Sequence, residues 1–134
     1  MPHPNEDLLR SLYERLHRGD VTGFLSGCAD DVVFSVPGHA AVSGTFTKAT
    51  FAGMARAAAV AEPGSFREDI VDVIANDEHG IVLLNHRLRR AGVAFAYRTA
   101  HVMTFSGGLI SSWWEHPGSV AELEAAWGPA PREP

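Results

Sequence analysis

The sequence predicts a single α+β domain in which a curved, cone-shaped antiparallel sheet packs on N-terminal helices around a central pocket. Residues 5–60 hold three segments with the apolar spacing of helices. Residues 66–116 instead alternate between apolar and polar side chains, in runs separated by turn residues. A short amphipathic segment at 119–128 closes the chain. Helices first, then strands, then one closing helix is the order of an α+β fold and not of alternating βαβ units.

The size and composition of the chain limit its organisation and its partners. Its 134 residues are expected to make one domain over 1–134, ordered at about 5–128, with a tail at 129–134. No apolar run approaches the roughly 18 residues of a membrane span, and the first residues lack the pattern of an export signal. The net charge of −5 argues against a nucleic-acid partner. We therefore expect a cytoplasmic protein with a small-molecule ligand and no nucleic-acid or membrane partner.

Capping residues and glycines mark the expected ends of four helices. Asn5 is the expected N-cap of the first helix, and Gly19 is its left-handed end. Asp20 caps a short second helix, and a third helix runs from about Thr47 to Val60. The last helix follows Ser119, which stands three residues before a glutamate, the spacing of a capping box.

Turn residues divide the rest of the chain into strands. The segment 31–36 has an apolar residue at every second position and predicts a first strand. Turn signals at 76–79, 91–92 and 107–108 then separate four strands. These four strands are expected to form an antiparallel meander.

The short loops predict which residues face the pocket, because opposed residues in an antiparallel pair share a face. A two-residue loop at 91–92 pairs His86 with Tyr97 and Val82 with His101. A loop at 107–108 predicts the pairs Phe105 with Ile110, Met103 with Ser112, His101 with Trp114 and Thr99 with His116. The shared face is apolar with a few polar groups, which is typical of a ligand pocket.

The catalytic candidates come from this face. His101 lies at its centre and is expected to polarise or protonate a ligand, with His116 or Tyr97 assisting. A buried histidine with satisfied hydrogen bonds is the structural alternative for His101. The residues predicted to contact the ligand are Phe34, Val36, Phe51, Met54, Leu84, His86, Thr99, Met103 and Trp114.

The opposite face of the sheet is expected to pack against a second copy of the chain. Its apolar area is too large for a free sheet surface, so a homodimer through the outer face is predicted. The apolar residues of this face are Ile81, Leu83, Val102, Leu109 and Trp113, and its polar residues include Arg87, Arg89, Arg98 and Glu115.

Neither a metal nor a cofactor is expected. His86, His101 and His116 are zinc ligands by residue type. However, His86 opposes Tyr97, which lies four residues, or roughly 13 Å, from His101 along one strand. The sequence also lacks a glycine-rich phosphate loop and a cofactor fingerprint.

Four short stretches, in a fixed order, support the same fold. They are RGD at 18–20, ADDVVF at 29–34, AHVMTF at 100–105, and GLI at 108–110 leading to Trp114. This succession resembles the SnoaL-like, nuclear transport factor 2-like superfamily, which has a cystatin-like fold and includes polyketide cyclases, ketosteroid isomerases and limonene epoxide hydrolases. The resemblance implies a cone-shaped sheet, an apolar pocket and a dimer through the outer sheet face.

The chain departs from this superfamily at positions that the resemblance links to catalysis. His101 stands in place of the acid that stabilises the enolate oxygen in the isomerases, and His116 stands where the epoxide hydrolases have an acid two residues after a tryptophan. Leu12 and Ser35-Val36 replace the isomerases' tyrosine and general base. Gly118 lies about where the cyclases keep an aspartate. Histidines are therefore expected to carry the chemistry.

Two classes of function follow from this reading. The first is a cofactor-free enzyme that binds an apolar, cyclic or polyketide-like metabolite and performs cyclisation, isomerisation, dehydration or epoxide opening. The second is a non-catalytic ligand-binding or dimeric assembly module of the same fold. Acid–base groups in the pocket distinguish the first class from the second.

Overall fold

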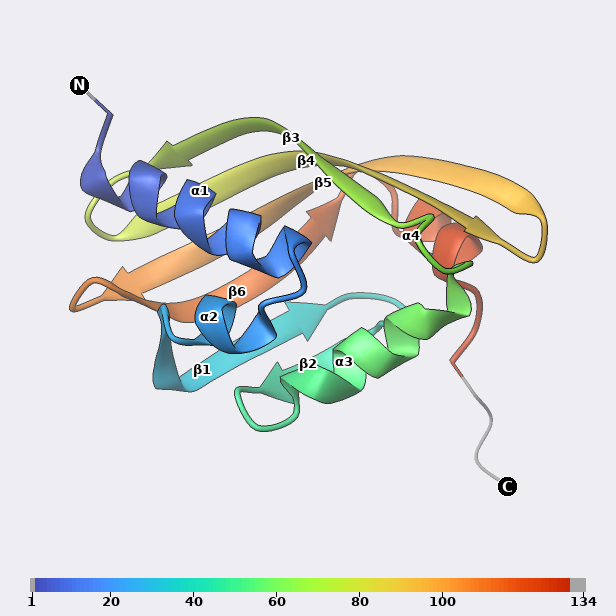
Figure 1. The fold of residues 1–134 in the computed structure, drawn as a ribbon, viewed down its shortest axis with the longest axis horizontal. Coiled ribbons are helices and arrows are strands. Elements are labelled where there is room, and N and C mark those ends of the chain that lie inside the picture. Colours follow the sequence, from blue (N-terminus) through green and yellow to red (C-terminus); the bar gives the residue numbers. More distant parts are fainter. Residues whose placement is uncertain (1, 131–134) are drawn as a thin grey trace.

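A computed structural model describes residues 2–130 of the chain. Its elements are α1 (Pro4–His17), α2 (Val21–Leu25), β1 (Cys28–Val36), β2 (Gly44–Thr47), α3 (Phe51–Ala57), the 3-10 turn η1 (Ala58–Val60), β3 (Arg67–Ala75), β4 (His79–Arg90), β5 (Val93–Ser106), β6 (Leu109–Pro117) and α4 (Val120–Trp127). Figure 1 shows one curved sheet with α1, α2 and α3 over the same face, while α4 packs near an end of β4 and β5. None of the described helices has the length and apolar character needed to cross a membrane.

The six strands form one sheet in the order β2-β1-β6-β5-β4-β3. Strands β3 to β6 form the predicted antiparallel meander, so the α+β class and the curved sheet are confirmed. The sheet is mixed rather than wholly antiparallel, because β1 runs parallel to β6. This parallel pairing brings Phe34 within 5.7 Å of Trp113, measured between ring centroids.

Most of the predicted helix ends are confirmed. Gly19 has φ +82°, and the Asp20 side chain accepts a hydrogen bond from the Gly23 amide at 2.8 Å. Ser119 caps α4 by accepting from the Glu122 amide at 3.2 Å. The predicted N-cap at Asn5 is wrong, because α1 starts at Pro4 and the His3 ring accepts the Asn5 amide at 3.0 Å. Proline suits this first helical position, since it has no amide proton to leave unpaired.

The segment predicted as a helix from Thr47 to Val60 is shorter in the structure. Thr47 ends β2, a strand that the sequence analysis missed, and α3 starts only at Phe51. The Thr50 hydroxyl accepts the Thr47 amide at 2.8 Å and holds the chain in a turn between the two. At the other end of the chain, Pro129 of the predicted tail pairs with Ala40 in a β-bridge. Residues 131–134 of that tail lie outside the described residues.

One predicted strand register is confirmed and the other is wrong. All of the pairs predicted across the 91–92 loop occur, including His86 with Tyr97. Across the 107–108 loop Phe105 faces Ile110 as predicted, but Thr104 then pairs with Ser112. Ser111 is therefore one extra residue on β6, which is a β-bulge.

This bulge reverses the faces of β6, because side chains alternate along a strand. His101 opposes Glu115 and not Trp114, and Met103 opposes Trp113 and not Ser112. Trp113 and Glu115, which were expected on the outer face, are buried inside. Trp114 is 38% exposed, and His116 is exposed as well. The inward orientation predicted for Trp114 and His116 is therefore wrong.

Candidate functional site

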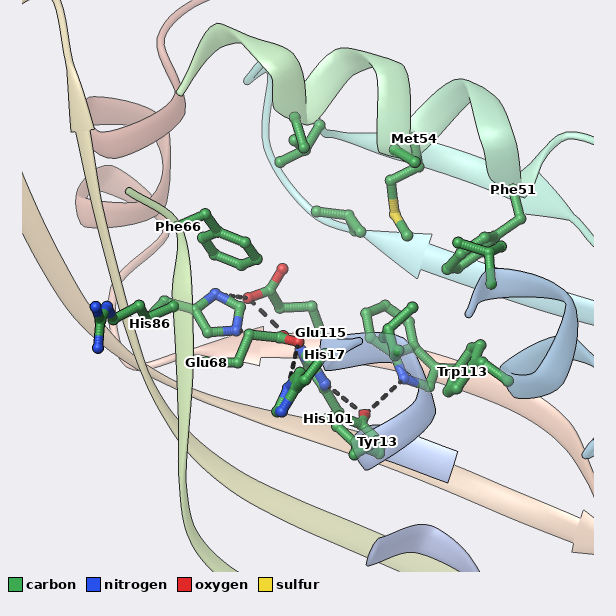
Figure 2. Close-up of a pocket in the computed structure, with 18 of the residues that line it drawn as sticks. Tyr13, His17, Phe51, Met54, Phe66, Glu68, His86, His101, Trp113 and Glu115 are labelled. Atoms are coloured by element: carbon green, nitrogen blue, oxygen red, sulfur yellow. Dashed lines mark hydrogen bonds and ion pairs between the residues drawn. The ribbon is translucent and has the colours of Figure 1, made fainter. Parts of the chain in front are cut away.

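A cavity of about 550 Å³ lies between the helices and the concave face of the sheet. Figure 2 shows Phe51 and Met54 of α3 on one side of it and a polar cluster with His86 and Glu115 on the other. Its apolar wall consists of Leu16, Val21, Phe24, Val36, Val42, Phe51, Met54, Ala55, Ala58, Phe66, Trp113 and Trp127. A mostly apolar wall with a few polar groups is typical of a small-molecule pocket.

The structure separates the predicted site residues into three groups. Those that line the cavity are Val36, Phe51, Met54, His86, Tyr97 and His101. Those that are buried but lie behind the cavity wall are Phe34, Leu84, Thr99 and Met103. Trp114 and His116 lie on the outer face of the sheet, where a ligand in the cavity does not reach them.

His101 is held by a chain of hydrogen bonds that fixes its tautomer. The Trp113 indole donates from Nε1 to the Tyr13 hydroxyl at 3.1 Å. The Tyr13 hydroxyl lies 2.6 Å from Nδ1 of His101, the one acceptor that the described residues offer it. A buried hydroxyl donates its proton where it can, so we assign the proton of this bond to Tyr13. Neutral His101 then carries its own proton on Nε2.

Nε2 of His101 is the one buried side-chain nitrogen or oxygen in residues 2–130 that lacks a hydrogen-bond partner. A buried histidine of purely structural role would have both ring nitrogens hydrogen-bonded, but in His101 only Nδ1 is. Burial lowers the pKa of His101 to about 3, and the neighbouring His86 lowers it too, against the attraction of Glu68. The imidazole is thus neutral at ordinary pH, with an unused N–H donor at the cavity. An unpaired buried donor costs about 1–3 kcal/mol, which a ligand oxygen would recover.

A second chain of the same kind orients His86. The Trp127 indole donates to the Tyr97 hydroxyl at 2.8 Å, and this hydroxyl shares a hydrogen bond of 2.9 Å with Nδ1 of His86. Tyr97 also donates to Oε2 of Glu115 at 3.3 Å. On its other side, His86 contacts Oε2 of Glu68 through Nε2 at 2.9 Å. The histidine therefore connects two carboxyl groups.

These two carboxyl groups have opposite environments. Burial would raise the pKa of Glu68, but hydrogen bonds from His17 and His86 outweigh it and hold that pKa below its ordinary value. Burial raises the pKa of Glu115, and its hydrogen bonds from Thr99 and Tyr97 compensate only in part. Glu68 is therefore an anion, whereas the pKa of Glu115 lies above the ordinary value of a carboxyl group, so Glu115 holds a proton more readily than Glu68 does. Carboxyl groups whose pKa values are pushed apart are typical of acid–base sites.

The sequence analysis missed Tyr13, Glu68, Trp113 and Glu115. Tyr13 had a usable signal, because it lies four residues after Leu9 on the buried stripe of α1. Glu68 pairs with His86 across β3 and β4. This pair could not be predicted by counting from the turn at 76–79, because a second bulge between Ile70 and Asp72 shifts the register. Trp113 and Glu115 were placed outside because of the bulge in β6.

Glu68, His86 and His101 also form a group of possible metal ligands, with one atom each and all three atoms within 4.8 Å of one another. In a tetrahedral zinc site, bonds of about 2.0–2.1 Å bring ligand atoms to about 3.4 Å from each other. Oε2 of Glu68 and Nε2 of His86 lie 2.9 Å apart, which is a hydrogen-bond distance and shorter than this spacing, so the side chains would have to move to bind zinc. Metal-bound histidines also donate from their second nitrogen. At His101 the second nitrogen is Nδ1, which in the assigned tautomer accepts from the Tyr13 hydroxyl and does not donate. The described arrangement of these side chains therefore does not match a zinc site.

Fold and site together define a small α+β protein with a largely apolar pocket and a cluster of histidine and carboxyl groups on one side of it. The chain belongs to the SnoaL-like domain family, whose model matches residues 9–113. The predicted membership of the SnoaL-like, nuclear transport factor 2-like superfamily is thereby confirmed. No curated protein matches the chain significantly.

Several solved structures share the fold. Bal32a, from a soil-derived mobile gene cassette, is 20% identical with a TM-score of 0.82, over 92% of this chain and 96% of its own. A nuclear transport factor 2-like protein of unknown function from Burkholderia pseudomallei K96243 is 23% identical with a TM-score of 0.80, over 92% and 96%. TerC, co-crystallised with polyporic acid, is 21% identical with a TM-score of 0.77, over 90% and 96%. At these identities the likeness concerns the fold alone.

Proposed function

We propose that this protein is a cofactor-free acid–base enzyme that binds an apolar cyclic carbonyl compound and moves a proton at the carbon next to the carbonyl group. The observation that carries the proposal is the unpaired Nε2 donor of His101, which lies 4.0 Å from Oε2 of Glu115. A hydrogen-bond donor and a proton acceptor at this spacing suit a carbonyl oxygen and the adjacent C–H bond.

In this proposal His101 and Glu115 have different roles. The carbonyl oxygen accepts the Nε2 proton of His101, and this bond strengthens as the oxygen becomes an enolate. Glu115 takes the proton from carbon, which its raised pKa favours because a weaker acid is a stronger base. Return of the proton at another carbon isomerises the substrate, while attack by the enolate or loss of a leaving group gives cyclisation or dehydration.

The non-catalytic binding module is the second candidate, and one observation favours it. His116, which the resemblance linked to an acid, points away from the cavity. However, Glu115 lies two residues after Trp113 and faces inward, so the pocket has the acid that the sequence analysis found missing. TerC was co-crystallised with polyporic acid, which makes this compound a reasonable binding probe.

The proposal is tested with 2-tetralone in D₂O, by following deuterium entry next to the carbonyl by NMR. The wild-type protein is expected to accelerate exchange, and Glu115→Gln and His101→Phe are expected to lose at least about a hundredfold of this acceleration. His116→Phe is the matched control, since it changes a histidine on the outer face, and it should keep the wild-type rate. Exchange by Glu115→Gln at the wild-type rate would refute the proposal. Quenching of Trp113 and Trp127 fluorescence by polyporic acid without any exchange would favour the binding module.

We also infer a homodimer through the outer sheet face. The reversed faces of β6 place Trp114 there, 38% exposed; Leu109 of β6 is 40% exposed and Val33 of β1 is 38% exposed. Ile81, Leu83 and Val102 extend this apolar surface over β4 and β5. Apolar surface of this kind on a sheet is commonly covered by a second copy of the chain.

A further inference from the structure

A continuous chain of hydrogen bonds leads from the protein surface to the candidate site. The His17 ring on α1 is 35% exposed, and its Nε2 lies 3.1 Å from Oε1 of Glu68. Oε2 of Glu68 lies 2.9 Å from Nε2 of His86, whose Nδ1 lies 2.9 Å from the Tyr97 hydroxyl. Tyr97 donates to Glu115 at 3.3 Å. Figure 2 shows the outer part of this chain, from His17 through Glu68 to His86.

We propose that His17, Glu68, His86 and Tyr97 form a proton path that connects Glu115 with solvent. The inference rests on the proposed function, because Glu115 has to return to its starting protonation state when the substrate's proton does not come back to carbon. The cavity wall is largely apolar, so bulk water is a poor partner for this step. Each member of the path is a group that can both accept and release a proton.

The proton movement balances without any co-reactant. Once Glu115 has taken up the substrate's proton, the Tyr97 hydroxyl turns from Glu115 to Nδ1 of His86, the other oxygen-to-nitrogen contact it makes. Glu115 then passes its proton to the Tyr97 oxygen while the hydroxyl proton of Tyr97 moves to Nδ1 of His86. His86 then gives the proton on Nε2 to Glu68. Rotation of the Glu68 carboxyl group presents this proton to Nε2 of His17, which releases one to water. One proton leaves the site, no other covalent bond changes, and the reverse sequence reloads Glu115.

A purely structural role for His17 predicts a different behaviour. His17 forms an ion pair with a carboxylate that is only 9% exposed, and its ring contacts the edge of Tyr13 at 6.2 Å between ring centroids. If His17 only held Glu68 in place, its loss would loosen the site and speed exchange of nearby protons with water. Loss of a proton path slows this exchange instead. The two roles therefore differ in the sign of the effect.

The experiment measures exchange of the histidine ring N–H protons with water by NMR, in full-length protein labelled with ¹⁵N-histidine. His17→Gln keeps a side-chain N–H that can donate to Glu68 but cannot release a proton. We expect the His86 signal to exchange about tenfold or more slowly in this variant, because exchange then waits for local opening of the structure. Free imidazole added to the buffer should restore part of the rate. The His101 N–H lies off the path and should exchange at an unchanged rate.

His79→Gln is the matched control, since His79 is an exposed histidine at the start of β4. If the His86 ring N–H exchanges with water at an unchanged or faster rate in His17→Gln, the proposed path is refuted. The tetralone assay reads the proposed function separately. Slower exchange of the His86 proton in His17→Gln, together with a wild-type protein that does not accelerate tetralone exchange, would support the path and refute the enzyme proposal. Accelerated tetralone exchange, together with an unchanged His86 proton in His17→Gln, would support the enzyme proposal and refute the path.

Discussion

Replacing Tyr13 with phenylalanine removes one oxygen and leaves two buried groups without partners. The Trp113 indole N–H loses its acceptor and Nδ1 of His101 loses its donor. A buried polar group left unpaired costs about 1–3 kcal/mol, so with two such groups the free energy of unfolding should fall by about 2–6 kcal/mol. At about 4 °C per kcal/mol for a domain of this size, the melting temperature should fall by about 8–24 °C.

The same variant tests the tautomer assigned to His101. Without the Tyr13 hydroxyl, nothing holds the proton of neutral His101 on Nε2, so the Nδ1–H form should become populated. ¹⁵N NMR of the histidine ring distinguishes the two tautomers, and thermal unfolding by circular dichroism gives the stability. Trp114→Phe serves as a control of similar size on the outer face. A Tyr13→Phe protein with wild-type stability and His101 still protonated on Nε2 would refute the hydrogen-bond argument.

Three further predictions follow from the site and the sheet. The pKa of His101 lies near 3 in the folded chain and near 6.5 in the unfolded chain, so the free energy of unfolding should fall as the pH drops from about 6.5 towards 3. His101→Gln should flatten this fall in urea denaturation. Burial raises the pKa of Glu115, so stability should also fall as the pH rises through that raised pKa, and Glu115→Gln should lack this loss. Trp114→Glu should convert a dimer to monomer in sedimentation equilibrium, whereas a monomeric wild-type protein would rule out the interface.

The register across one hairpin could be predicted, and the register across the next could not. Ala91-Gly92 is a two-residue loop, with φ +51° at Ala91 and +78° at Gly92, and it fixes β4 against β5 along their whole length. After Gly107-Gly108 the strand reads Leu-Ile-Ser-Ser-Trp-Trp-Glu-His. Serine and tryptophan each occur twice in succession, and two titratable residues follow, so moving the strand by one residue leaves an equally plausible alternation. Only packing selects Trp113 over Trp114 for the interior.

The candidate site is a row of side chains that crosses four strands, and its chemistry depends on the bulge in β6. Glu68 of β3 pairs with His86 of β4, which pairs with Tyr97 of β5. His101, four residues along β5, pairs with Glu115 of β6. Because adjacent strands lie about 4.8 Å apart, cross-strand neighbours are close enough for hydrogen bonds between long side chains. Without the bulge in β6, His116 would replace Glu115 on this face, and the cavity would keep its histidines but lose the carboxyl group beside His101. The bulge at Ser111, rather than the residue types alone, therefore places an acid–base pair in the pocket.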